Sequence, residues 1–130
     1  MIINDAPGGV VVVTPVLKGI DLIENQYGIK GTAYIAEEND IGSDCFHFQV
    51  LTPEFVLNSL CENKILNGRG IFIVQNYSEE LLVSEINNIL QDCIRPTWDE
   101  AAIAINRYLN WEYDNIHYFT EREILSSLGI

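Results

Sequence analysis

The clearest pattern along the chain is the alternation of apolar and polar residues in FHFQV, residues 46–50. A period of two is typical of a strand that buries one face. It predicts that the two phenylalanines share one side and that His47 points to the other. The stretch continues directly into Thr52-Pro53-Glu54. This corner could therefore serve chemistry, or it could only join a strand to a helix.

Three other stretches predict strands. Residues 10–17 begin with four consecutive valines, although Pro15 favours an edge position or an early end. Residues 32–36 follow a glycine-flanked turn expected at 28–31. Residues 70–74 are almost continuously apolar, which favours a central position in the sheet.

The corner itself carries ordinary helix-start signals. Thr52 is a good N-cap, Pro53 suits the first helical position, and the carboxylate of Glu54 favours the positive end of the helix dipole. These signals predict a helix from Pro53 to about Asn63 and explain the corner without catalysis. The apolar side of this helix comprises Phe55, Val56, Leu57, Leu60 and Cys61.

Capping residues predict three more helices. Ser78 precedes a helix that stops before Pro96, and two capping boxes, Thr97 with Glu100 and Thr120 with Glu123, open the next two. Helical spacing predicts inward side chains in the first two of these, namely Leu82, Ile86, Ile89, Leu90 and Cys93, then Ala101, Ala104, Ile105, Tyr108 and Leu109.

Strands precede most of the helices in this order of elements. Such an order favours an α+β fold over alternating βαβ units. We expect a mainly antiparallel sheet of about four to five strands, with three to four helices packed mostly on one face. The length of 130 residues fits a single domain, residues 1–130.

Charge changes the picture more than hydropathy does. Seven basic and nineteen acidic residues give a net charge of −12. This surface would repel nucleic acid and anionic membranes and attract a cationic partner. Solubility is the plainer explanation, since acidic residues favour it. We expect a cytoplasmic protein, because the chain shows neither a secretory leader nor a membrane-length apolar run.

Candidate catalytic groups are sparse. His47 could act as a base for Cys45 or Ser43, two and four residues before it, but a solvent-facing or hydrogen-bonded strand histidine is favoured. His117 lies in an aromatic linker and is expected to be packed or on the surface. Three widely spaced cysteines match neither a disulfide framework nor a zinc site, so we expect no cofactor and no metal.

Aromatic residues gather near the end of the chain. They could seal the hydrophobic core, or they could anchor a protein interface, where tryptophan and tyrosine are enriched. Glu112 and Asp114 lie among them, and this mixture suits a cationic protein partner. The cluster comprises Tyr108, Trp111, Tyr113, Tyr118 and Phe119.

Several of these residues together resemble a known family. The resemblance rests on Gly42, Asp44, Phe46, Phe48, Val50, Thr52-Pro53 and Phe55, then strand 71–74, Thr97-Trp98-x-Glu100 and Arg107-Tyr108-x-x-Trp111-Glu112-Tyr113. In this order they are similar to immunity protein family eight of bacterial polymorphic toxin systems, which includes proteins of the contact-dependent growth inhibition type. The resemblance covers roughly residues 40–114. Where that family more often has Trp-Leu after Thr-Pro, this chain has Glu54-Phe55-Val56.

The resemblance implies a small cytoplasmic inhibitor that binds the C-terminal domain of a toxin, often a nuclease, without catalysis. Acidic residues would then mimic the polyanionic substrate and steer association. The contacts we predict first are Glu37, Glu38, Asp40 and Asp44, followed by Glu112 and Asp114. Two alternatives stay open, an acidic adaptor without a toxin partner and a small hydrolase.

Overall fold

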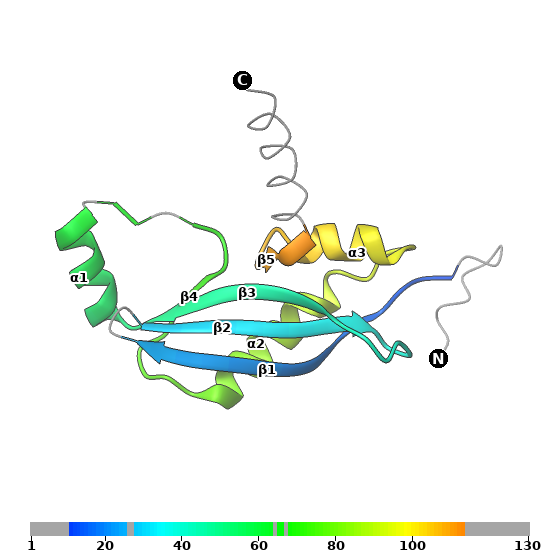
Figure 1. The fold of residues 1–130 in the computed structure, drawn as a ribbon, viewed down its shortest axis with the longest axis horizontal. Helices are drawn as coiled ribbons and strands as arrows, with labels where there is room; N and C mark the ends of the chain where they lie inside the picture. The colour runs from blue at the N-terminus through cyan, green and yellow to red at the C-terminus, as the bar shows by residue number, and fades with distance from the viewer. Residues whose placement is uncertain (1–10, 26–27, 64, 67, 114–130) are drawn as a thin grey trace, which may run out of the picture.

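The computed structural model describes residues 11–25, 28–63, 65, 66 and 68–113 (Figure 1). Within them, strands and helices follow one another in the expected α+β order. The elements are β1 (Pro15–Asn25), β2 (Gly28–Glu37), β3 (Asp44–Leu51), α1 (Pro53–Asn63), β4 (Ile71–Ile73), α2 (Glu79–Gln91), α3 (Trp98–Ile105) and β5 (Asn110–Trp111).

The sheet is an open, mostly antiparallel one in the order β1-β2-β3-β4, and β5 also pairs with β3. β1, β2 and β3 form an antiparallel meander, with Asn25 opposite Gly28 and Thr32 opposite His47. β4 runs parallel to the end of β3, while β5 runs antiparallel to its beginning. The predicted α+β fold with a mainly antiparallel sheet is confirmed.

The alternation in β3 separates the two faces of the sheet as predicted. Phe46, Phe48 and Val50 are buried, whereas His47 and Gln49 are exposed. The buried set joins Ala33 and Ile35 of β2 in the main hydrophobic cluster. One face of the sheet is therefore the core, and the other is open along β2 and β3.

Two helices cover the core face. In Figure 1, α2 lies behind the strands and α3 lies above them, at the end where β5 meets β3. The residues predicted to face inward from the helix after Ser78 are all buried, namely Leu82, Ile86, Ile89 and Leu90 in α2 and Cys93 just after its end. Apolar burial of this kind is the main favourable term in folding, so the spacing in α2 is the feature that fixes it against the sheet.

The predicted caps are confirmed for both of these helices. The Ser78 hydroxyl accepts a hydrogen bond from the Leu81 backbone N–H at 3.3 Å. The Thr97 hydroxyl accepts one from the Glu100 backbone N–H at 3.2 Å. Each cap satisfies a backbone donor that the first helical turn leaves without a partner.

The structure corrects the prediction for the first strand. β1 starts at Pro15 and continues to Asn25, and Val13 makes only an isolated bridge with Arg95. The run of valines led to a predicted strand that begins too early in the sequence. The extent of β1 is instead determined by its pairing with β2. The edge position that Pro15 favoured is confirmed, since β1 is the first strand in the sheet order.

Two further predictions about the sheet were wrong. Gly31 lies inside β2, opposite Phe48, and not in a turn. β4 is a short strand at the end of the sheet path, and its Ile73 is 59% exposed. Among the described residues, β4 does not have a paired strand on each side. Its apolar run instead reflects packing of Phe72 against Phe48, whose ring centroids lie 5.6 Å apart.

The inward residues of α3 also differ from the prediction. Ala101, Ala104, Ile105 and Leu109 are buried as expected, but Tyr108 is 46% exposed. α3 ends at Ile105, so the helical spacing that would turn Tyr108 inward no longer applies. Ala102 is buried in addition to the predicted set. The final helix predicted from Thr120 lies outside the described residues.

Replacing Gly31 with alanine is expected to lower the free energy of unfolding by about 2 kcal/mol, as overpacking does. A Cβ atom at Gly31 would lie 2.2 Å from Cζ of the Phe48 ring, so this core ring would have to move. Chemical denaturation measures the change. Gly19→Ala is the matched control, because its Cβ would meet nothing closer than 3.9 Å. Equal effects of the two substitutions would contradict the explanation.

Candidate functional site

The turn between β2 and β3 presents three of the predicted acidic residues together. Glu37, Glu38 and Asp40 are all exposed. The turn is held by its backbone, with the Asp40 N–H donating to the Glu37 carbonyl at 3.0 Å, and by Lys18, whose Nζ donates to the Glu38 carbonyl at 3.1 Å. One oxygen of Asp40 accepts the N–H of Gly42 at 3.2 Å. We call Glu37, Glu38 and Asp40 the acidic turn.

Among the described residues, no side-chain partner engages the carboxylates of Glu37 and Glu38, whether by a hydrogen bond or by an ion pair. The ammonium group of Lys18 donates to the backbone carbonyl of Glu38 and not to either carboxylate. Their negative charge is therefore available to a partner.

Asp44 has a different environment, although it lies close in sequence. Its Oδ2 atom accepts hydrogen bonds from the indole N–H groups of Trp98 at 3.0 Å and Trp111 at 3.1 Å. One carboxylate oxygen at the start of β3 thus joins α3 and β5. The ring of Phe46 packs between the same indoles, edge-on to Trp98 at 6.5 Å and stacked on Trp111 at 6.3 Å. We call Asp44, Phe46, Trp98 and Trp111 the indole joint.

Glu112 is also engaged within the chain. Its Oε2 atom accepts the backbone N–H of Cys45, which fastens the segment after β5 to the start of β3. Tyr113 is 49% exposed and packs edge-on against Trp111, with ring centroids 5.9 Å apart. Asp114, Tyr118, Phe119 and His117 lie outside the described residues.

The structure therefore divides the predicted contact residues into two groups. The acidic turn brings together three free or nearly free carboxylates. Asp44 and Glu112 lie at the base of the turn, half-buried, and each uses one oxygen for the fold. Sequence alone cannot separate these groups, because the donors that engage them lie more than fifty residues away.

The geometry around His47 does not form a nucleophilic pair. Nδ1 of His47 lies 3.2 Å from the Thr32 hydroxyl. Cys45 shares the open face, but burial raises the pKa of its thiol, and Glu112 raises it further by hydrogen bonding and charge. A raised pKa keeps the thiol protonated, whereas a nucleophile requires the thiolate. Ser43 precedes β3 and lies outside the strand alternation.

The open face of the sheet is a feature that sequence reasoning did not single out. Asp21, Thr32, His47 and Asn110 form one row across β1, β2, β3 and β5. A shallow depression of about 540 Å³ lies over this row and is bordered by Lys30 and Arg69, among other residues. The signal that could have found it is the polar half of the alternation in β2 and β3.

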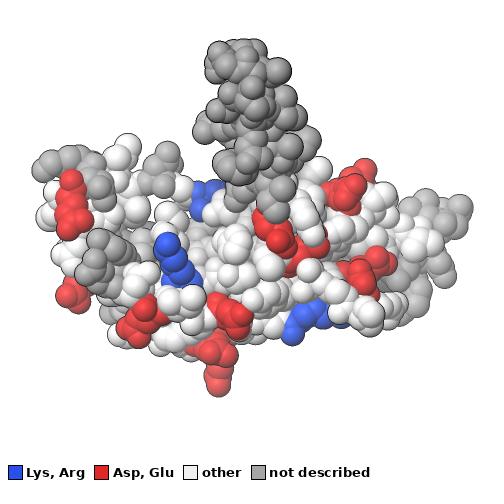
Figure 2. All heavy atoms as spheres, viewed as in Figure 1, with Lys and Arg blue, Asp and Glu red and all other residues white. Residues whose placement is uncertain are grey.

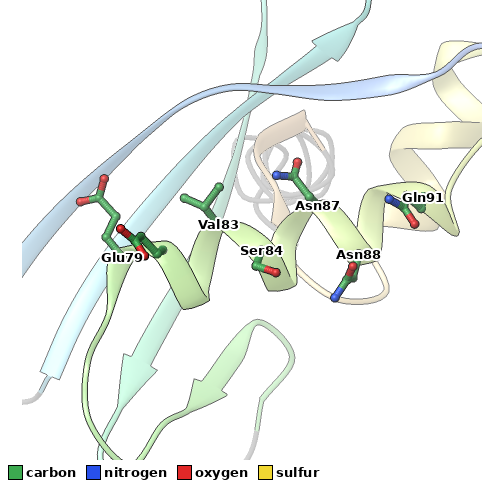
Figure 3. A pocket seen from close by; sticks show the side chains of 7 residues that line it. Glu79, Val83, Ser84, Asn87, Asn88 and Gln91 are labelled. Carbon is green, nitrogen blue, oxygen red and sulfur yellow. The ribbon is translucent and has the colours of Figure 1, made fainter.

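A second depression, of about 590 Å³, follows the outer side of α2. Figure 3 shows its labelled side chains on successive turns of this one helix. The described residues that line it are Glu79, Glu80, Val83, Ser84, Asn87, Asn88 and Gln91. Most of them carry an amide or a carboxylate, and this set contains no histidine, cysteine or basic residue.

Charges of both signs appear on the face shown in Figure 2, with acidic groups spread across it and a few basic groups between them. Within the described ranges, no cluster of three or more histidine, cysteine or acidic side chains could hold a metal ion. A search of the same residues for a helix both long enough and apolar enough to span a membrane finds none.

Comparison with curated proteins and with solved structures gives no match. The family resemblance noted in the sequence receives independent support from a family model. This model, described as Immunity protein 8, matches residues 23–116, a range that includes β2 to β5 and α1 to α3. The chain belongs to the Immunity protein 8 family.

Proposed function

We propose that this protein neutralises a cationic toxin domain, in particular a nuclease, by binding it through the acidic turn. The family assigns an immunity role against a toxin. The observation that carries the finer proposal is the pair of unengaged carboxylates on Glu37 and Glu38. A nuclease must hold a polyanionic backbone, so its substrate site is basic. An acidic projection is complementary to such a site.

The net charge of −12 supports the same proposal through kinetics. Complementary charge accelerates diffusional encounter and discriminates against wrong partners. Asp44 and Glu112 add negative potential at the base of the turn. Both hydrogen bonds to Asp44 go to its Oδ2 atom, so its second oxygen, Oδ1, can face the toxin.

The biological setting belongs to the proposal as well. The protein would act in the bacterial cytoplasm, beside a toxin of the contact-dependent growth inhibition type or a related polymorphic toxin. Inhibition would require only binding, since the thiol of Cys45 is held protonated and His47 contacts a hydroxyl.

The double substitution Glu37→Gln with Glu38→Gln is expected to slow association with the toxin domain by about threefold to tenfold at low ionic strength. The amides keep the size of the side chains and remove two charges. Stopped-flow association rates at several salt concentrations measure the effect, and the wild-type rate should fall more steeply with salt.

Glu79→Gln with Glu80→Gln is the matched control, because it removes the same charge from the exposed first turn of α2. We expect a smaller change in the association rate for this pair. Equal slowing by both pairs would show that net charge, and not the acidic turn, steers the encounter. If the wild-type chain neither binds the toxin domain nor protects cells that express it, the proposed function is wrong.

A further inference from the structure

Helix α1 is the least buried helix of the described chain. None of the described side chains in Pro53–Asn63 is buried, whereas α2 and α3 each bury four residues. Figure 1 shows α1 beyond the ends of the strands, away from α2 and α3. An isolated helix of this length is marginal in water, because tertiary packing supplies most helical stability. α1 therefore lacks the packing that its apolar composition would allow.

The exposed side of α1 is an apolar stripe. Leu57 is 63% exposed and Leu60 is 37% exposed, and Cys61 is exposed as well. Residues three and four apart lie on one helix face, so these three side chains are neighbours. The half-buried side chains described in α1 are Phe55, Val56 and Ser59. Leu57, Leu60 and Cys61 belong to the apolar side that the sequence predicted for this helix, and all three are exposed.

Further exposed apolar side chains lie near α1 in the sequence or at the same end of the sheet. Ile65, shortly after α1, is 68% exposed. Ile73 of β4 is 59% exposed and pairs with Leu51, the last residue of β3 before α1 begins. Contiguous exposed apolar surface is characteristic of protein interfaces. Nothing in the described chain covers the stripe.

The charges around the stripe decide which partner fits. Glu54 and Glu62 are the only charged residues of α1, and the whole chain carries a net charge of −12. Two copies meeting through α1 would bring four carboxylates and two strongly negative molecules together, which Coulomb repulsion opposes. A partner with basic residues around an apolar depression would gain apolar contact with the stripe and electrostatic attraction to Glu54 and Glu62.

We propose that the stripe of Leu57, Leu60 and Cys61 on α1 is the hydrophobic anchor of the toxin interface, received by an apolar depression rimmed with lysine or arginine. This inference rests on the proposed function and adds the surface that holds the complex together. Apolar anchors near the centre of an interface carry most of its binding energy, while charged rims govern encounter.

The distance between α1 and the acidic turn is compatible with one interface. They lie at opposite ends of β3, whose eight residues span about 26 Å at the rise of a strand. A standard interface of about 800 Å² on each partner is roughly 30 Å across. Because the acidic turn and the stripe both lie beyond the ends of β3, a toxin surface larger than this standard size would touch both, with the acidic turn acting on association and the stripe on dissociation.

The test is the double substitution Leu57→Gln with Leu60→Gln, which removes apolar surface without changing charge. The probe is the purified, catalytically inactivated toxin domain encoded in the neighbouring reading frame. We expect the dissociation constant to rise at least tenfold, mostly through faster dissociation, with an unchanged salt dependence. Leu81→Gln is the control, since Leu81 is a 56% exposed leucine on α2, and we expect a change of less than twofold.

Each outcome separates the two proposals. If the wild-type chain does not bind the toxin domain, the proposed function fails. If the wild type binds and the Leu57/Leu60 variant binds as tightly, only the anchor is wrong.

Amide exchange on the unaltered chain gives a second readout, since α1 should gain protection in the complex, and no gain would overturn the anchor. Light scattering should find the free chain monomeric, and a dimer that the double substitution dissociates would assign the stripe to a second copy.

Discussion

Replacing Phe46 with alanine is expected to lower the free energy of unfolding by about 3–5 kcal/mol, the usual cost for a buried phenylalanine. Phe46 is fully buried on the core face of β3. Its ring contacts the indoles of Trp98 and Trp111, so truncation leaves a cavity where α3 and β5 meet the sheet. Equilibrium denaturation followed by tryptophan fluorescence measures both the stability and the environment of these indoles.

Two variants test whether the loss comes from this packing. Phe46→Leu keeps most of the apolar volume and loses the ring contacts, so it should cost less than half as much as Phe46→Ala. Phe55→Ala removes a ring that is only half-buried on α1 and should also cost much less. A Phe55→Ala variant as unstable as Phe46→Ala would show that α1 contributes to the core more than its burial indicates.

Replacing Asp44 with alanine is expected to lower the free energy of unfolding by about 3 kcal/mol. The substitution removes the single oxygen that accepts both indole N–H groups, and hydrogen bonds to a charged acceptor contribute about 1.5–3 kcal/mol each. We take the lower part of this range because Asp44 is only half-buried. Denaturation of the variant gives the loss, and near-ultraviolet circular dichroism reports whether the indoles lose their fixed geometry.

Asp44→Asn separates a structural role of Asp44 from a contact with the toxin. Its amide oxygen still accepts hydrogen bonds, so most of the stability should remain while the charge is gone. Trp98→Phe and Trp111→Phe complete double-mutant cycles with Asp44→Ala, which measure each coupling directly. Coupling energies near zero in both cycles would contradict the indole joint. Weak toxin binding by a stable Asp44→Asn variant would instead assign the charge to the interface.

The sequence predicted those elements whose signals are local. Ser78 and Thr97 cap their helices, and FHFQV alternates across the sheet, because a cap and a strand period depend on neighbouring residues alone. β4 and the first strand were placed wrongly because position in a sheet depends on distant partners. Apolar content shows that a segment is buried somewhere, but not how many strands flank it.

The same reason limited the prediction of the site. The composition pointed to the acidic turn, and Glu37, Glu38 and Asp40 lie together on it. The composition could not show that Asp44 and Glu112 accept hydrogen bonds from groups 54 and 67 positions away. The composition also could not show that Leu57 and Leu60, on the predicted apolar side of α1, are exposed, since an apolar stripe at the surface has the same helical period as one that meets the sheet.

The three strands of the meander are synthesised well before Trp111, which packs on their core face, and this order has a consequence during synthesis. β1, β2 and β3 pair with their neighbours in the chain, so their ladder is complete once Leu51 is free. Trp111, which covers Phe46, follows roughly 60 residues later, about 3 to 12 s at the usual rate of translation. Until then Phe46 and the part of the sheet face around it remain uncovered, even after α2 has been synthesised, and this is when we expect the nascent chain to need a chaperone.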